Sequence, residues 1–218
     1  MSKSQPRRQA GDAGFTVLEV AVAIFVLTVG VVSVAALAAT MMTTGNRSKY
    51  MSLEASLASE KLEDLARWPA PAIQVCVPTG SASVGSLTSP ILQTTQCPTN
   101  PDGSAGASGP VAYYDDVNIN FSNNTSDCPS STGGCFAETI TFQSNGTTEY
   151  TTTYHSPDGT ITNSTNTSAP VNMSFHRSWI IEANSPVTGV RRVTVLVTLN
   201  NTNVEPSNAQ FQMSMVRP

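Results

Sequence analysis

The chain has 218 residues and a formal net charge of −4 at pH 7, and 12% of its residues are charged, against roughly 25% in an average soluble protein. An acidic balance excludes nucleic-acid binding through general basicity, and we predict no specific nucleic-acid partner. Fourteen glycines and fourteen prolines are too few for a collagen-like repeat.

The N-terminal region combines a short basic leader with a long apolar run. Residues 1–14 are polar and include three basic side chains, whereas Val20–Met42 contains no charged residue. As a helix, these 23 residues would extend about 35 Å at ~1.5 Å per residue, which is enough to cross a bilayer. The basic leader favours a cytoplasmic N-terminus. The sequence therefore predicts a single membrane span.

One carboxylate, Glu19, directly precedes the apolar run. On insertion scales, an acidic residue at the centre of a membrane helix costs about 2.5–3.5 kcal/mol, so such a group commonly marks a partner or a function. The structural alternative is a glutamate at the membrane edge whose carboxylate reaches water.

The segment Gly14–Glu19 (GFTVLE) resembles the cleavage and methylation motif of type IV prepilins. The resemblance implies that a prepilin peptidase cuts after Gly14 on the cytoplasmic side and that the new N-terminal residue, Phe15, is N-methylated. It also implies that the amine of an incoming subunit pairs with Glu19 of its neighbour. Such pairing would give each charge a partner in a low-dielectric setting.

Within this family, Glu19–Gly30 (EVAVAIFVLTVG) is most similar to the PilV-type minor pilins, the pilus-modification branch. The I-type minor pseudopilins of type II secretion share its opening. The resemblance implies partnership with other pilins or pseudopilins through the N-terminal helix, with an inner-membrane assembly platform and with membrane lipid. It places the N-terminus in the cytoplasm and the head in the periplasm. The mature protein would then belong to a pilus at the cell surface, or to a periplasmic pseudopilus.

An ordinary secretory signal is the competing interpretation of the same region. A basic leader, an apolar run and Ala36–Ala38 (ALA) outline such a signal, and its cleavage would release a soluble protein that begins near Ala39. However, the apolar run exceeds the usual length of about 7–15 residues, and Glu19 would have no role inside it.

The region after the span predicts a continuation of the helix. Five apolar residues of Asn46–Trp68 recur at spacings of three to five residues, near the helical period, with polar positions such as Glu54 between them. The prolines of Pro69–Pro71 end the pattern. We therefore expect one helix over Phe15–Trp68. Its first half is apolar all round, and its second half is amphipathic and should pack on a sheet.

The middle of the chain has a different composition. In Pro98–Pro170, 45 of 73 residues are Ser, Thr, Asn, Gly or Pro, which favours loops and exposed strands. Strand patterns occur at Val111–Phe121, Ala137–Phe142 and Thr147–Tyr154. We expect a loop-rich insertion between the helix and the C-terminal sheet.

The four cysteines, Cys76, Cys97, Cys128 and Cys135, all lie in the wider middle region, Ala72–Pro170. An even number of cysteines in an exported domain favours two disulfides, and four cysteines allow three pairings. Pairing of sequence neighbours, Cys76–Cys97 and Cys128–Cys135, is the simplest of these. A zinc site and free thiols remain alternatives, although no histidine is close in sequence.

The C-terminal region predicts three antiparallel strands, at Met173–Asn184, Val190–Leu199 and Gln210–Val216. Their alternating apolar residues form one side of a sheet, on which the leucines of the amphipathic helix should pack. We place Phe175 and Trp179 in this core.

The sequence contains no recognised catalytic motif: no nucleophile elbow, no phosphate loop and no His-Glu-x-x-His zinc site. We therefore expect neither an enzyme nor a cofactor. The expected fold is α+β and pilin-like, a long N-terminal helix packed on an antiparallel sheet. The predicted segments are a leader (1–14), a transmembrane and fibre-core helix (15–42), its amphipathic continuation (43–68), a loop-rich head region with the cysteines (69–170) and the sheet (171–218).

These sequence features are compatible with three alternative functions. The first is a minor pilin of a type IV pilus, with a head that serves assembly or cell adhesion. The second is a minor pseudopilin of type II secretion. The third is a soluble secreted binding domain.

Overall fold

The computed structural model of the chain describes residues 16–120, 135–144, 147–156, 159–168, 175–200 and 210–218. The chain divides into two compact units, Met1–Gly45 and Asn46–Pro218. Gly14, Phe15 and Cys128 lie outside the described residues, so the roles predicted for them stay predictions.

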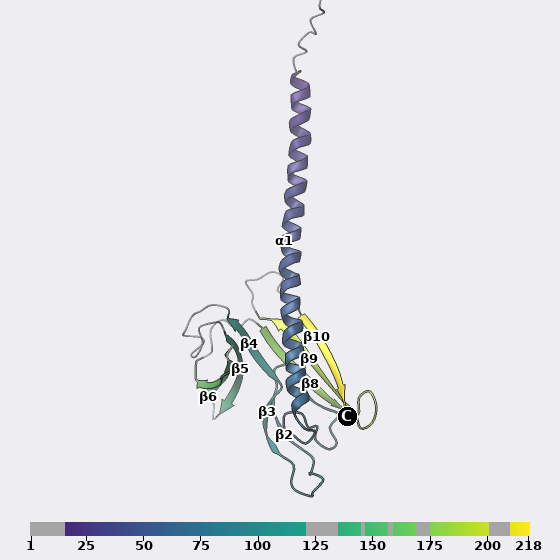
Figure 1. Cartoon of the computed structure of the whole chain (residues 1–218), viewed down its shortest axis with the longest axis vertical. Helices are drawn as coiled ribbons and strands as arrows, with labels where there is room; N and C mark the ends of the chain where they lie inside the picture. Colours follow the sequence, from purple (N-terminus) through teal and green to yellow (C-terminus); the bar gives the residue numbers. More distant parts are fainter. Residues whose placement is uncertain (1–15, 121–134, 145–146, 157–158, 169–174, 201–209) are drawn as a thin grey trace, which may run out of the picture. The chain divides into compact units, whose positions relative to one another are not determined.

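The long helix predicted from the sequence is present. Helix α1 spans Val17–Arg67 and contains 51 residues (Figure 1). The Thr16 hydroxyl caps it, because its Oγ1 accepts a hydrogen bond from the backbone N–H of Glu19 at 3.3 Å. The helix ends just before Trp68 and Pro69, as the prolines predict. These bounds differ from the expected ones by one or two residues.

In the first unit, every described residue of α1 is exposed. The helix contains an 18-residue window with a mean hydropathy of 2.8, of which 0% is buried. By length and composition alone, this helix is able to cross a membrane. A signal sequence near the N-terminus would have the same properties.

The second unit contains a large antiparallel sheet. Its strand order is β10-β9-β8-β4-β5-β6-β7, and β1 pairs with the part of β8 beyond β4. A separate two-stranded sheet is formed by β2 and β3. The strands are β1 (Ser83–Gly85), β2 (Leu92–Gln96), β3 (Ser108–Ala112), β4 (Tyr114–Asn120), β5 (Cys135–Ser144), β6 (Thr147–His155), β7 (Ile161–Asn166), β8 (Phe175–Ala183), β9 (Arg191–Leu199) and β10 (Gln210–Arg217).

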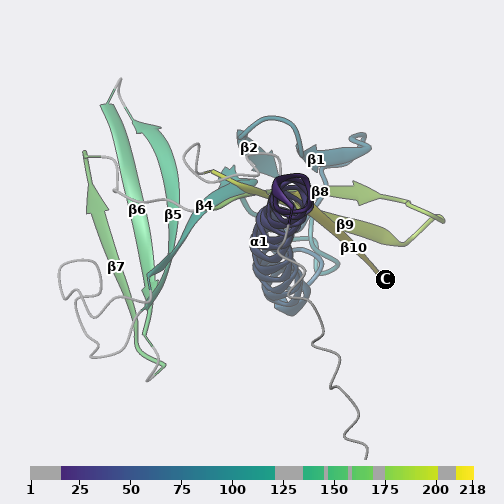
Figure 2. The same cartoon turned by 90° about the horizontal axis from the view of Figure 1, so that it is seen from above.

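The core lies between the sheet and the part of α1 that follows Gly45. Figure 2 shows this part of the helix over β8, β9 and β10, with β5, β6 and β7 to one side. Trp179 pairs with Val195 in the β8–β9 register, and both belong to the buried cluster. The helix contributes its leucines, and Leu57, Leu62 and Leu65 are buried in the same cluster. The predicted packing of the amphipathic helix on the three C-terminal strands is therefore confirmed.

The sheet is larger than the sequence predicted. Strands β5 and β6 cover the predicted segments Ala137–Phe142 and Thr147–Tyr154, but they join the main sheet through β4 rather than a separate loop region. The predicted strand at Val111–Phe121 is interrupted at Tyr113, where the chain passes from the small sheet to the large one. Threonine-rich strands have little apolar patterning, so the sequence does not indicate which sheet they join. Backbone hydrogen bonds between the strands determine it.

The close approach of β1 to β8 requires a glycine at position 85. Gly85 has φ +83°, and a Cβ there would lie 2.2 Å from the carbonyl oxygen of Trp179 and 3.0 Å from the Tyr113 side chain. A backbone oxygen cannot rotate away as a flexible side chain could. We expect Gly85→Ala to lower the free energy of unfolding by about 2–3 kcal/mol, since the left-handed conformation costs roughly 1–2 kcal/mol and the contact adds to it.

Gly80→Ala is the matched control for this substitution. Gly80 has φ +87° and no atom within 4 Å of an added Cβ, so only the conformational cost of about 1 kcal/mol applies there. Urea unfolding of the two variants measures the difference. Equal losses would show that the contact with β8 contributes nothing.

Candidate functional site

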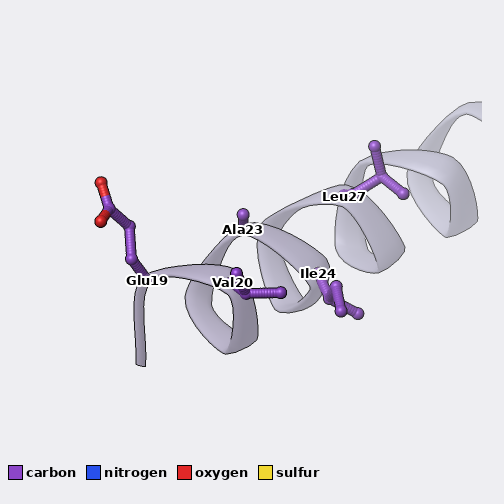
Figure 3. Close-up of a pocket in the computed structure, with 5 residues that line it drawn as sticks. All are labelled: Glu19, Val20, Ala23, Ile24 and Leu27. Atoms are coloured by element: carbon purple, nitrogen blue, oxygen red, sulfur yellow. The ribbon is translucent and has the colours of Figure 1, made fainter. Parts of the chain in front are cut away.

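The predicted assembly residue, Glu19, lies in the first turn of α1 and is exposed. Figure 3 shows its carboxylate projecting from the helix, followed by the apolar side chains of Val20, Ala23, Ile24 and Leu27. These residues form an open surface along the helix rather than an enclosed cavity. Among the residues that the structure describes, Glu19 has no side-chain partner.

Glu19 also has a local structural explanation. A carboxylate in the first turn of a helix is stabilised by the partial positive charge of the unpaired backbone N–H groups. Its own N–H contacts the Thr16 cap. This local role is compatible with a role in assembly, because the carboxylate stays exposed while it interacts with the helix N-terminus.

A buried cluster of charged residues joins α1 to the sheet in the second unit. Arg177 of β8 donates two hydrogen bonds to Asp115 of β4, from Nε at 2.7 Å and from Nη2 at 2.8 Å. Lys61 Nζ of the helix lies 2.9 Å from Asp115 Oδ2. Glu138 of β5 pairs with Arg177 and lies 3.8 Å from Lys61 Nζ. Two more exposed carboxylates of the helix lie at the edge of the cluster: Glu60 Oε2 is 3.7 Å from Arg177 Nη1, and Asp64 Oδ2 is 3.8 Å from Lys61 Nζ.

The electrostatics of the cluster hold Asp115 and Arg177 in their charged forms. Burial by itself would raise the pKa of Asp115, but the charges and hydrogen bonds of Arg177 and Lys61 outweigh it and lower the pKa to about 2. Burial would correspondingly lower the pKa of Arg177, and Asp115 and Glu138 raise it instead. The cluster is thus a clamp between three strands and the helix.

The clamp is completed by two further contacts of the helix. Lys61 Nζ lies 4.6 Å from the centre of the Trp179 ring, within the range of a cation–π interaction. Arg177 Nη1 donates to the backbone carbonyl of Leu57 at 3.4 Å. The cluster therefore fixes both the position of the helix along β8 and its rotation about its own axis.

Each of the two histidines is paired with a carboxylate. His155 Nε2 lies 3.3 Å from Glu138 Oε2, at the edge of the buried clamp. His176 Nδ1 lies 2.8 Å from Asp116 Oδ1. Neighbouring residues of a strand point to opposite faces, so His176 and Asp116 lie on the face of the sheet away from Arg177 and α1.

The first predicted disulfide is confirmed. Cys76 and Cys97 are bonded, with their Cα atoms 5.6 Å apart. This bond leaves no thiolate there for the alternative zinc site. The second predicted pair is not tested, because Cys128 and the side chain of Cys135 lie outside the described residues.

Sequence reasoning missed the clamp and the burial of one helix residue. Glu54 was expected among the polar positions of the helix, but it is 0% exposed. The sequence does contain one sign of these buried charges: a charged residue that interrupts an apolar pattern. Arg177 does so in β8, and Lys61 does so in α1, four residues after Leu57. The partner of Arg177 is 62 residues away in sequence, so no local pattern could identify it.

Comparison with known proteins yields no match: no family model fits the chain, and neither a curated protein nor a solved structure is similar to it. A functional assignment therefore depends on the residues and the geometry of this chain.

Proposed function

We propose that the chain is a minor pilin of a bacterial type IV pilus. Prepilin peptidase cleaves it after Gly14, and Phe15 becomes the N-methylated end of the mature subunit. The apolar part of α1 holds the subunit in the inner membrane and then packs among other pilins in the fibre or its tip complex. The unit Asn46–Pro218 is the displayed head, and its work is packing and display rather than catalysis.

The position of Gly14–Glu19 carries this proposal. In the sequence, the residues that resemble a prepilin cleavage site run into the first turn of a helix that is apolar and exposed through Gly45. An exposed apolar surface of this length is unfavourable in water, so it requires lipid or other helices. The same helix then continues into a head in which it packs on an antiparallel sheet, the layout that the pilin resemblance implies.

Cleavage is tested by the mass and N-terminal sequence of the protein isolated from membranes with and without prepilin peptidase. We expect a chain that begins at N-methylated Phe15 only when the peptidase is present. Gly14→Val should abolish processing, because it places a branched side chain at the cleaved bond, whereas Gly11→Val in the same leader should be processed normally. A chain that begins near Ala39 regardless of the peptidase would establish ordinary secretion instead.

Assembly is tested separately through Glu19. The substitution Glu19→Gln keeps the size of the side chain and removes its charge. We expect normal cleavage and at least a tenfold loss of the subunit from sheared fibres, since the incoming amine loses its partner. Glu63→Gln, an exposed position in the head part of α1, is the control and should assemble normally. Undiminished incorporation of Glu19→Gln would refute the pairing.

A minor pseudopilin of type II secretion is the second candidate, because Glu19–Ala23 (EVAVA) is an opening that both groups share. Deletion of the gene distinguishes the two functions. Loss of piliation or twitching with normal secretion supports the pilus, and the opposite pattern supports the secretion system.

A further inference from the structure

The carboxylate of Glu54 is buried and has no partner among the residues that the structure describes. The residue is 0% exposed and lies in the stripe of α1 that packs on the sheet. No described residue donates a hydrogen bond to Oε1 or Oε2. Burial raises the pKa of this carboxyl to about 7. Glu54 thus differs from Asp115, which is equally enclosed but bound by Arg177 and Lys61.

The described residues of the strands packed against this part of the helix offer no compensating charge. Leu57 lies at the level of Arg177, so the turn of Glu54 lies nearer the end of the sheet where β8 begins and β9 ends. The helix-facing side chains at that end are apolar and belong to or pack against the core cluster: Phe175 of β8, Val197 and Leu199 of β9, and Phe211 of β10.

The charged groups that face α1 from the sheet are paired with groups other than Glu54. Asp115, Arg177 and Glu138 surround Lys61, two helical turns further on. Arg191 and Arg217 donate to backbone carbonyls at and beyond the end of the helix. On the helix itself, the charged residues around Glu54 are Arg47, Lys49, Glu60 and Lys61. None of these groups contributes to the pKa shift of Glu54, which burial alone explains.

A carboxyl group that is buried without a partner is stable in its protonated form and unstable in its ionised form. Burial of an ionised carboxylate without a partner costs several kcal/mol, and a buried carboxyl therefore stays protonated until the surrounding structure opens. Opening of the turn lets water reach the carboxylate and returns it to the ordinary acidity of glutamate. Ionisation and opening of this turn are therefore linked.

We propose that Glu54 makes the seating of α1 on the head sheet depend on pH, so that the segment Tyr50–Ala58 is held when Glu54 is protonated and released when it is ionised. This goes beyond the proposed function, since it concerns a conformational response of the head itself. An exported head has the pH of its surroundings, so its first helical turns would loosen as an acidic medium becomes neutral.

The sign of the expected effect follows from proton uptake. Between about pH 4.5 and pH 7, the folded head keeps the Glu54 proton and the unfolded chain has lost it. The free energy of unfolding therefore falls as pH rises through this window, and it becomes constant above pH 7, where both states are ionised.

The test uses the full chain in mild detergent and compares the wild type with Glu54→Gln and with Glu63→Gln. Urea unfolding is measured between pH 4.5 and pH 8.5. We expect the urea midpoint of the wild type to fall relative to that of Glu54→Gln up to about pH 7 and then to stay constant. Glu63→Gln should follow the wild type, because Glu63 is exposed. The three proteins differ only at positions 54 and 63, so the contributions of all other groups cancel in the comparison.

Hydrogen exchange of the segment Tyr50–Ala58 locates the opening. After correction for the intrinsic rate, its protection in the wild type should decrease from pH 5 to pH 8 by tenfold or more, and Glu54→Gln should keep it constant. The same pH dependence of protection in both proteins would overturn the proposal. Should Glu54→Gln fail to fold, the ¹³C chemical shift of the wild-type Glu54 carboxyl decides the matter: a midpoint near 7 supports the proposal, and one near 4.5 contradicts it.

Discussion

Replacement of Arg177 by methionine is expected to lower the free energy of unfolding of the head by about 3–5 kcal/mol. The substitution keeps most of the volume of the side chain but removes the charge that holds Asp115. Asp115 is 1% exposed, so its carboxylate would remain buried with Lys61 as its remaining strong partner. Glu138 would lose a partner at the same time.

Urea unfolding of the full chain in detergent measures this loss, and the fluorescence of Trp179, which is 4% exposed, reports it. Arg192→Met is the matched control, because Arg192 forms a similar two-bond pair with Glu182 at the surface. Surface pairs contribute little, so this control should change stability far less.

A double variant separates the clamp from simple loss of packing. Asp115→Leu combined with Arg177→Met removes both charges and leaves Lys61 and Glu138 to balance each other. We expect the double variant to be more stable than Arg177→Met alone, since it leaves no unpaired buried carboxylate at Asp115. If the double variant loses the sum of the two single losses, the two residues act independently and the clamp interpretation is wrong.

Removal of the disulfide has the second largest expected effect. The Cys76–Cys97 bond spans a sequence separation of 21 residues, and closure of a loop of this length restricts the unfolded chain by about 3 kcal/mol. The closed loop contains β1, which pairs with β8. We therefore expect Cys76→Ala/Cys97→Ala to lose about 3 kcal/mol in urea unfolding. Alanine avoids placing a hydroxyl in these buried positions.

Reduction of the wild type supplies an independent measurement of the same bond. The urea midpoint of the reduced wild type should approach that of the double alanine variant. Peptide mapping under non-reducing conditions tests the pairing itself, and it also tests the predicted bond between Cys128 and Cys135. A peptide that joins Cys76 to either of these cysteines would contradict the structure.

The elements that depend on local patterns could be predicted from the sequence. The bounds of α1 follow from an apolar run, an amphipathic continuation and the prolines after Trp68, all within one segment of chain. The three C-terminal strands follow from the alternation of apolar residues, and the burial of Phe175 and Trp179 follows from the same pattern. The Cys76–Cys97 bond follows from proximity in sequence.

The sequence predicts where the threonine-rich strands lie along the chain, but not which strands they pair with. The segment Thr147–Tyr154 has the composition of a strand, but neither of its faces is clearly apolar, so its pattern says nothing about its neighbours. Its partners, β5 and β7, are determined by backbone hydrogen bonds that any side chain permits.

The sequence by itself determined the long apolar helix, its continuation along an antiparallel sheet and the motif at Gly14–Glu19, because each depends on residues that are close in the chain. Only the tertiary structure decided that Arg177 is bound by Asp115 and that Glu54 is buried with no partner among the described residues. The energy of a buried charge depends on which groups surround it in space, and those groups come from strands and turns that are far apart in the sequence.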